Sequence, residues 1–147
     1  MSTPITPSLT LVDEDTNAFN KIMSAFGLPK GTDEEKKLRT EAIQSATKHA
    51  IEIPFRVMEL SYQSMEVIKA MAETGNPNSL SDAGVGALCA RSAVMGAFLN
   101  VRINAQGLND KKFIRSVIGK GTRIEEKSKK MESQILRIVN KEISTNK

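Results

Sequence analysis

The apolar residues of this chain recur every three or four positions along nearly its whole length, which is the spacing of one face of an α-helix. No convincing run of alternating apolar and polar residues, the pattern of a strand, interrupts them. Thr32-Asp-Glu-Glu35 forms a capping box, in which the threonine oxygen accepts from the amide of Glu35, so one helix begins there. The pattern predicts four helices, over residues 10–26, 32–74, 81–106 and 109–141.

Proline and glycine mark the irregular points of this pattern. Residues 1–9 contain two prolines and are predicted to be a disordered leader, so that a single domain spans residues 10–147. Pro54 removes a backbone donor inside the second helix and predicts a kink. Gly119 and Gly121, each costing about 1 kcal/mol relative to alanine, predict a break or bend in the last helix. Four long helices with short connections predict an all-α fold, an antiparallel helical bundle.

The third predicted helix carries a line of small residues with polar ends. Asp82 and Asn100 are 18 residues apart, which is five turns, and Asn104 lies one turn further on. We call these residues, with those between them on the same azimuth, the small-residue line: Asp82, Gly86, Cys89, Ala93, Gly96, Asn100 and Asn104. Periodicity alone favours a packing seam, although small side chains also admit a flat ligand. Asp82 and Asn100 are about 27 Å apart along one helix, so a common site needs a long cleft or a dimer mate.

Three other residues are chemical candidates. Asp15 stands beside the apolar face of the first helix, where a carboxylate near the core can act as an acid or base; the alternative is a charge that complements the helix dipole. His49 is the only histidine and is predicted to lie on the surface. Cys89 is the only cysteine and is predicted to be a small core residue.

The composition of the chain and the absence of several catalytic motifs exclude some classes of function. The net charge of +4 is concentrated in residues 109–147, which hold 11 basic and 5 acidic residues but one aromatic, so base stacking and a nucleic-acid partner are not expected. The chain has no HExxH, GxSxG, P-loop or paired-cysteine motif, which argues against zinc hydrolase and acyl-serine chemistry. Without a signal peptide or an uninterrupted apolar span of membrane length, a cytoplasmic protein with no membrane partner is expected.

Several short segments stand in a specific order and spacing: Leu11-Val-Asp-Glu-Asp15, Ala18-Phe19, Leu28-Pro-Lys30, Pro54, Gly75-Asn76, Ser81-Asp-Ala83 and Gly96-Ala-Phe-Leu-Asn-Val-Arg-Ile-Asn104. Together they resemble the cyclodeaminase/cyclohydrolase family of folate enzymes. The resemblance implies an all-helical homodimer or higher homo-oligomer that acts on a tetrahydrofolate derivative without a metal or redox cofactor. The implied reactions are conversion of 5-formimidoyltetrahydrofolate to 5,10-methenyltetrahydrofolate and ammonia, or interconversion of the methenyl and 10-formyl forms.

Both reactions pass through a tetrahedral carbon between two folate nitrogens and need proton transfer. The resemblance therefore implies Asp82 or Asp15 as the proton carrier and Asn100 and Asn104 as folate-binding residues. Lys30, Lys111 and Lys112 are the candidates to attract the anionic glutamate tail of the folate. Family members usually carry an additional N-terminal glycine-rich part that this sequence lacks. The alternative is a non-catalytic helical assembly or adaptor module derived from the family.

Overall fold

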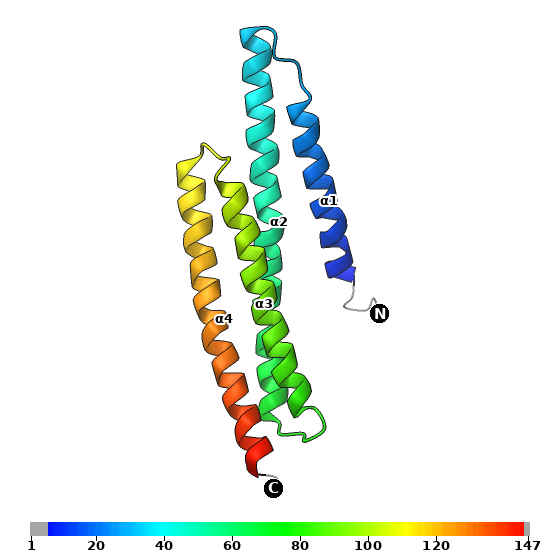
Figure 1. Cartoon of the computed structure of the whole chain (residues 1–147), viewed down its shortest axis with the longest axis vertical. Coiled ribbons are helices and arrows are strands. Elements are labelled where there is room, and N and C mark those ends of the chain that lie inside the picture. Colours follow the sequence, from blue (N-terminus) through cyan, green and yellow to red (C-terminus); the bar gives the residue numbers. More distant parts are fainter. Residues whose placement is uncertain (1–5, 146–147) are drawn as a thin grey trace.

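A computed structural model of the chain describes residues 6–145, with side chains from Thr10 onward, and contains four α-helices (Figure 1). They are α1 (Thr6–Phe26), α2 (Asp33–Glu73), α3 (Leu80–Ala105) and α4 (Lys111–Thr145). Successive helices run in opposite directions, with short connections between them. The predicted all-α arrangement of long helices is confirmed.

Several predicted boundaries differ from the structure. Helix α1 begins at Thr6, so residues 6–9 of the predicted leader are helical, and residues 1–5 lie outside the described part of the chain. Helix α2 passes through Pro54 without a break, and the predicted kink there stays a prediction. Helix α4 is continuous through Gly119 and Gly121, so no break is present there, and the predicted bend stays a prediction.

Packing explains why α4 has a glycine in mid-helix. A Cβ atom on Gly121 would overlap the ring of Phe98, at 2.9 Å from its Cδ2 atom. The missing side chain therefore lets α4 lie against α3 at this level. Gly119 has no such neighbour, since a Cβ atom there would meet nothing within 4 Å.

Three apolar clusters hold the helices together. The largest joins α2, α3 and α4 and is centred on Ile51, Met58, Val94, Phe98 and Val101. A second joins the same helices nearer the end of α4. The third lies between α1 and α2 and comprises Leu11, Ala18, Ala50 and Ile53 with the partly buried Ile22 and Val57. Among the described helices α1 packs against α2 alone, so the chain is a three-helix bundle with α1 added along part of one side.

Polar contacts stabilise the start of α2 and join its N-terminal part to the connection between α3 and α4. The predicted capping box is present, with the Glu35 amide donating to Thr32 Oγ1 at 3.1 Å. The side-chain amide of Gln44 donates to the Gly107 carbonyl at 2.8 Å and accepts from the Asn109 amide at 2.7 Å. These bonds attach the connection between α3 and α4 to the side of α2.

The small-residue line is not the buried side of α3. Asp82, Cys89 and Asn100 are exposed, so most of the line packs against nothing in the described bundle, although Gly86 lies close to Ile68 of α2. The prediction of a core cysteine is wrong. The buried side carries instead the larger residues that meet α2 and α4. Arg91, on the azimuth opposite the line, is buried with its Nε atom 3.8 Å from Glu132 Oε2 of α4.

Helix α3 is also the one described helix long and apolar enough to cross a membrane by length and composition. About 44% of its most apolar window is buried in the bundle, and core helices of ordinary globular proteins meet the same criterion. The observation is weak evidence for a membrane span.

Candidate functional site

A groove lies between α1 and α3, which both pack on α2 and do not contact each other. Its volume is about 470 Å³, within the range of small-molecule sites. Its lining comes from all three helices: Leu11, Val12, Asp15 and Thr16 of α1, Ile53, Pro54, Val57, Leu60 and Ser61 of α2, and Ala93, Ala97 and Asn100 of α3. We call it the α1–α3 groove.

The helical period of each element explains which residues reach the groove. On α1, Leu11 is buried against α2 while Val12, Asp15 and Thr16 occupy the adjacent, exposed stripe at spacings of three and four. Pro54 lines the groove from α2, and because it has no N–H it cannot donate to the carbonyl of Ala50. The small Ala93 and Ala97 on α3 leave room for a ligand.

The polar groups of the groove come from separate helices. Asp15 offers a carboxylate that accepts hydrogen bonds, Asn100 an amide that both donates and accepts, and Ser61 a hydroxyl. The Thr16 hydroxyl donates to the Val12 carbonyl at 3.1 Å, which leaves its oxygen free to accept. An apolar floor edged by these groups suits a flat heterocycle that carries both N–H and carbonyl groups.

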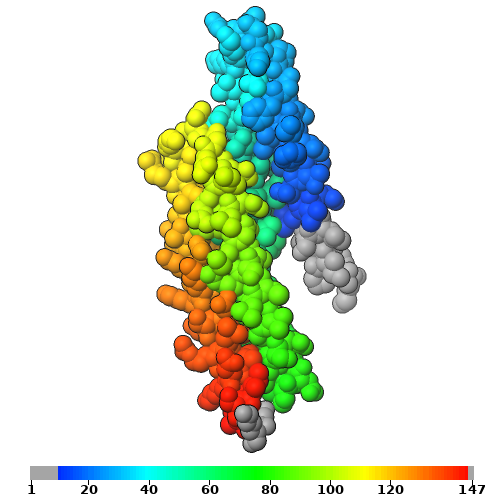
Figure 2. All heavy atoms as spheres, viewed as in Figure 1, coloured from blue at the N-terminus to red at the C-terminus, as the bar shows by residue number. Residues whose placement is uncertain are grey.

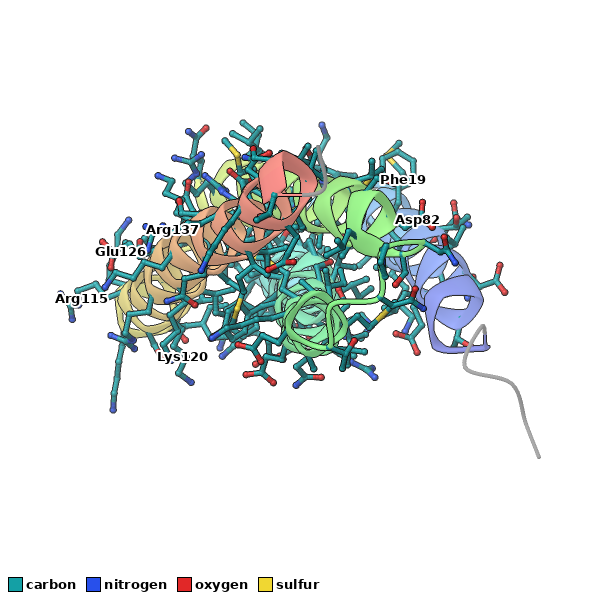
Figure 3. All side chains as sticks on the ribbon, turned by 90° about the horizontal axis from the view of Figure 1, so that it is seen from below. Phe19, Asp82, Arg115, Lys120, Glu126 and Arg137 are labelled. Carbon is teal, nitrogen blue, oxygen red and sulfur yellow. The ribbon has the colours of Figure 1, made fainter. Side chains whose placement is uncertain are left out.

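The predicted site residues divide into two groups. Asp15 and Asn100, which are 85 positions apart in the sequence, line the same groove. Asp82, Asn104 and Lys30 do not line it. Asp82 is in the first turn of α3, on the side facing α1 but five turns from Asn100 (Figure 3), and Lys30 is in the connection before α2.

The environment of Asp15 also differs from the expectation. Its side chain is exposed rather than held against the core, because the apolar contacts of α1 are made by Leu11 and Ala18 on the neighbouring stripe. The adjacent Glu14 lies 3.6 Å from Arg56 of α2, which ties this turn of α1 to α2. The Asp15 carboxylate is therefore open to a ligand in the groove.

The groove contains residues that sequence reasoning missed. Thr16 and Ser61 give no signal in the sequence, since each is an ordinary polar residue on an exposed helical stripe. Only the packing of α1 on α2 brings them to the same groove. In the part of the chain that the structure describes, no group of three or more His, Cys, Asp or Glu side chains could hold a metal ion.

His49 lies outside this groove. It is exposed, as predicted, with its Nδ1 atom 3.6 Å from Glu52 Oε2. Together with Lys21 it borders a shallower groove between the C-terminal half of α1 and α2, floored by small side chains.

The sequence profile of the formiminotransferase-cyclodeaminase family matches residues 5–122, which is most of the chain. The chain belongs to this family. Its named members place the family in folate one-carbon metabolism, as the resemblance predicted.

Two curated relatives show how much of a family protein the chain represents. It is 42% identical to the methenyltetrahydrofolate cyclohydrolase of Methylorubrum extorquens over 103 residues, which are 70% of this chain and 50% of the relative. It is 35% identical to the formimidoyltransferase-cyclodeaminase of Gallus gallus over 133 residues, which are 90% of this chain and 25% of the relative. The chain thus spans about half or less of these relatives.

A solved structure supports the fold. The crystal structure of formiminotetrahydrofolate cyclodeaminase from Thermotoga maritima superposes with a TM-score of 0.77, covering 91% of this chain and 63% of that one. At 22% sequence identity the likeness establishes the helical arrangement.

Proposed function

We propose that the chain acts in folate one-carbon metabolism on a tetrahydrofolate derivative bound in the α1–α3 groove. The observation that carries this proposal is the meeting of Asp15 and Asn100 in one groove. The reaction we favour is the cyclohydrolase reaction on 5,10-methenyltetrahydrofolate, because the relative with 42% identity bears that name. The cyclodeaminase reaction, which forms the same methenyl compound and ammonia from 5-formimidoyltetrahydrofolate, is the second candidate and is favoured by the other named relatives.

Each groove residue has a role in this proposal. Water adds to the methenyl carbon, and the Asp15 carboxylate takes the proton that the water releases. Asp15 returns this proton to N5 as the bond between N5 and the carbon breaks, and the hydroxyl proton of the adduct passes to solvent as the carbonyl of the 10-formyl group forms. The Asn100 amide hydrogen-bonds the heterocycle, and the apolar walls formed by Val57 and Ala97 cover its faces. The reaction written this way needs only the proton acceptor and water.

The residues outside the groove keep secondary roles. Lys30, and Asn104 one turn beyond Asn100, would contact the glutamate tail or the far end of the ligand. Asp82 would serve only in a site completed by another subunit, since it is about 27 Å from Asn100 along α3. The exposed apolar side chains of Leu99 and Ile103 on the outer face of α3 support a homodimer as part of the proposal. A free, exposed Cys89 fits a reducing compartment such as the cytoplasm.

Substitution of Asp15 by asparagine tests the proton carrier. We expect Asp15→Asn to lower kcat by about 10²- to 10⁴-fold, the usual contribution of a positioned acid or base, with little change in binding of 5-formyltetrahydrofolate by calorimetry. Asn100→Ala should instead weaken that binding. Asp13→Asn is the matched control, because Asp13 is exposed on the same helix and does not line the groove. If Asp15→Asn keeps its turnover and Asp82→Asn loses it, Asp82 is the proton carrier and the assignment to Asp15 is wrong.

The second candidate function is a non-catalytic helical assembly module. It is favoured by the basic side chains that α4 directs away from the groove, including Arg115, Lys120 and Arg137 (Figure 3). A chain that binds no 5-formyltetrahydrofolate even at millimolar concentration would favour this module over the enzyme.

A further inference from the structure

Helix α1 covers only about half of the length of α2. Helix α2 has 41 residues and α1 has 21, lengths of about 62 Å and 32 Å at 1.5 Å per residue. Helix α1 lies beside the N-terminal part of α2 and stops short of its C-terminal part (Figure 1). Toward that end of α2, only α3 and α4 accompany it among the described helices.

The apolar line of α2 that contacts α1 nevertheless continues past it. The line has alternating spacings of four and three. It consists of the apolar Ile53, Val57, Leu60, Val67 and Met71, with the polar Ser64 between Leu60 and Val67. Ile53 is buried beneath α1, whereas the later members Leu60, Val67 and Met71 are 38%, 62% and 44% exposed. The same helix face is thus covered along one half and bare along the other.

The small-residue line of α3 borders this bare face. A Cβ atom on Gly86 would lie 3.2 Å from Ile68 Cδ1, so this side of α3 adjoins α2 beside the bare line. We define the lower trough as Leu60, Val67 and Met71 of α2 with Gly86, Cys89 and Ala93 of α3. It runs along residues 60–71 of α2, about 17 Å by the helical rise. Figure 2 shows α3 reaching the surface along this part of the molecule.

The shape and charge of the lower trough fit a helix. Large apolar side chains stand on one wall and small ones on the other, which lets a helix axis approach closely while burying Val67 and Met71. None of the trough-defining residues is charged, while Asp82 stands at one end and Asp15 lines the groove at the other. A matching helix is about three turns long, with an apolar and small-residue face and a basic side chain near each end.

We propose that the lower trough docks such an α-helix, contributed by a polypeptide corresponding to the part of the relatives that this chain does not match. The matched region is only 50% of the cyclohydrolase and 63% of the solved cyclodeaminase structure, so the fold as those proteins have it contains further chain. The trough continues the line of α1 and shares Leu60 and Ala93 with the α1–α3 groove. The docked helix therefore also closes the open end of that groove. The inference rests on the bare helix faces and stands whether or not the groove is catalytic.

The single cysteine gives a direct test, because Cys89 is exposed and lies in the lower trough. The chain is co-produced with the portion of the Methylorubrum cyclohydrolase outside the 103 matched residues and purified through a tag on the chain. We expect a one-to-one complex in which maleimide alkylation of Cys89 is about tenfold slower when nine-tenths of the chain is bound. The control is Met95→Cys in a Cys89→Ser background: position 95 is exposed and about 120° away around α3, so its alkylation should not change.

A pair of substitutions locates the surface independently. Val67→Asp places a charge in the lower trough and should abolish the complex, whereas Leu88→Asp, on the outer face of α3, should leave it intact. Both positions are exposed, so both variants should fold with unchanged helicity by circular dichroism. The proposal is overturned if no complex purifies, or if positions 89 and 95 are protected equally. It is also overturned if Cys89 becomes protected in the chain alone as its concentration rises, since a second copy would then occupy the trough.

Discussion

The two sides of α3 are similarly apolar, but one is buried and the other is exposed. One side carries Val94, Phe98 and Val101 and is buried against α2 and α4. The other side carries the small-residue line and an outer apolar face that is exposed: Val85, Leu88, Met95, Leu99 and Ile103. A helix that is apolar on all sides is normally buried on all sides. Helix α3 is therefore suited to contacts on both sides, and the described helices supply them on one side only.

Truncation of two adjacent residues of α3, one on the buried side and one on the exposed side, should have very different effects on stability. Phe98→Ala removes a buried ring that fills the space opposite Gly121, and we expect it to lower the free energy of unfolding by about 3–5 kcal/mol. Leu99→Ala, one residue further on the exposed side, should change it by less than about 0.5 kcal/mol in the monomeric chain. Urea denaturation at low protein concentration measures both. Equal losses would show that Leu99 is already covered.

Alanine substitutions at the two glycines of α4 should have opposite effects on stability. Gly121→Ala places a methyl group into the Phe98 ring, and overpacking of this kind costs about 1–3 kcal/mol despite the better helix propensity of alanine. Gly119→Ala meets open space and should stabilise the chain by about 0.5–1 kcal/mol. Thermal unfolding followed by circular dichroism distinguishes the two signs. Stabilisation by both variants would contradict the tight contact between α3 and α4.

The smallest expected effect concerns the connection between α3 and α4. The Phe113 amide, which donates to Asp110 Oδ1 at 2.9 Å, and the hydrogen-bonded Lys48 hold the pKa of Asp110 below its usual range. Because the folded pKa is lowered, this carboxylate stabilises the fold above the pKa that it has in the unfolded chain. That stability is lost as pH falls through the folded pKa. The Tm difference between the native chain and Asp110→Asn should therefore be constant near neutral pH and shrink below the usual aspartate range.

Lys48→Met serves as the control for that titration. It removes the ammonium group that lies 3.3 Å from Asp110 but keeps the amide of Phe113. The pH dependence should therefore become weaker without disappearing. A Tm difference for Asp110→Asn that persists unchanged to the lowest pH would contradict the assignment of this carboxylate.

Local signals in the sequence were sufficient for the helices but not for their irregularities. The capping box at Thr32 is present, because cap and backbone lie within three residues of each other. The alternative of a break near Gly121 is wrong, because the partner of Gly121, Phe98, lies on another helix and no local pattern reveals it. The exposure of Cys89 was missed for the same reason, since burial depends on which neighbouring helix covers a face.

Local patterns are enough for the four long helices, for the azimuth shared by Asp82, Asn100 and Asn104, and for membership of a folate enzyme family, because period, caps and motifs are properties of neighbouring residues. The fold is needed to show that Asp15, and not Asp82, lines the same groove as Asn100. Helix α3 is continuous and holds its own two polar residues five turns apart, whereas the packing of α1 on α2 brings a carboxylate from far away in the sequence to the groove that Asn100 lines.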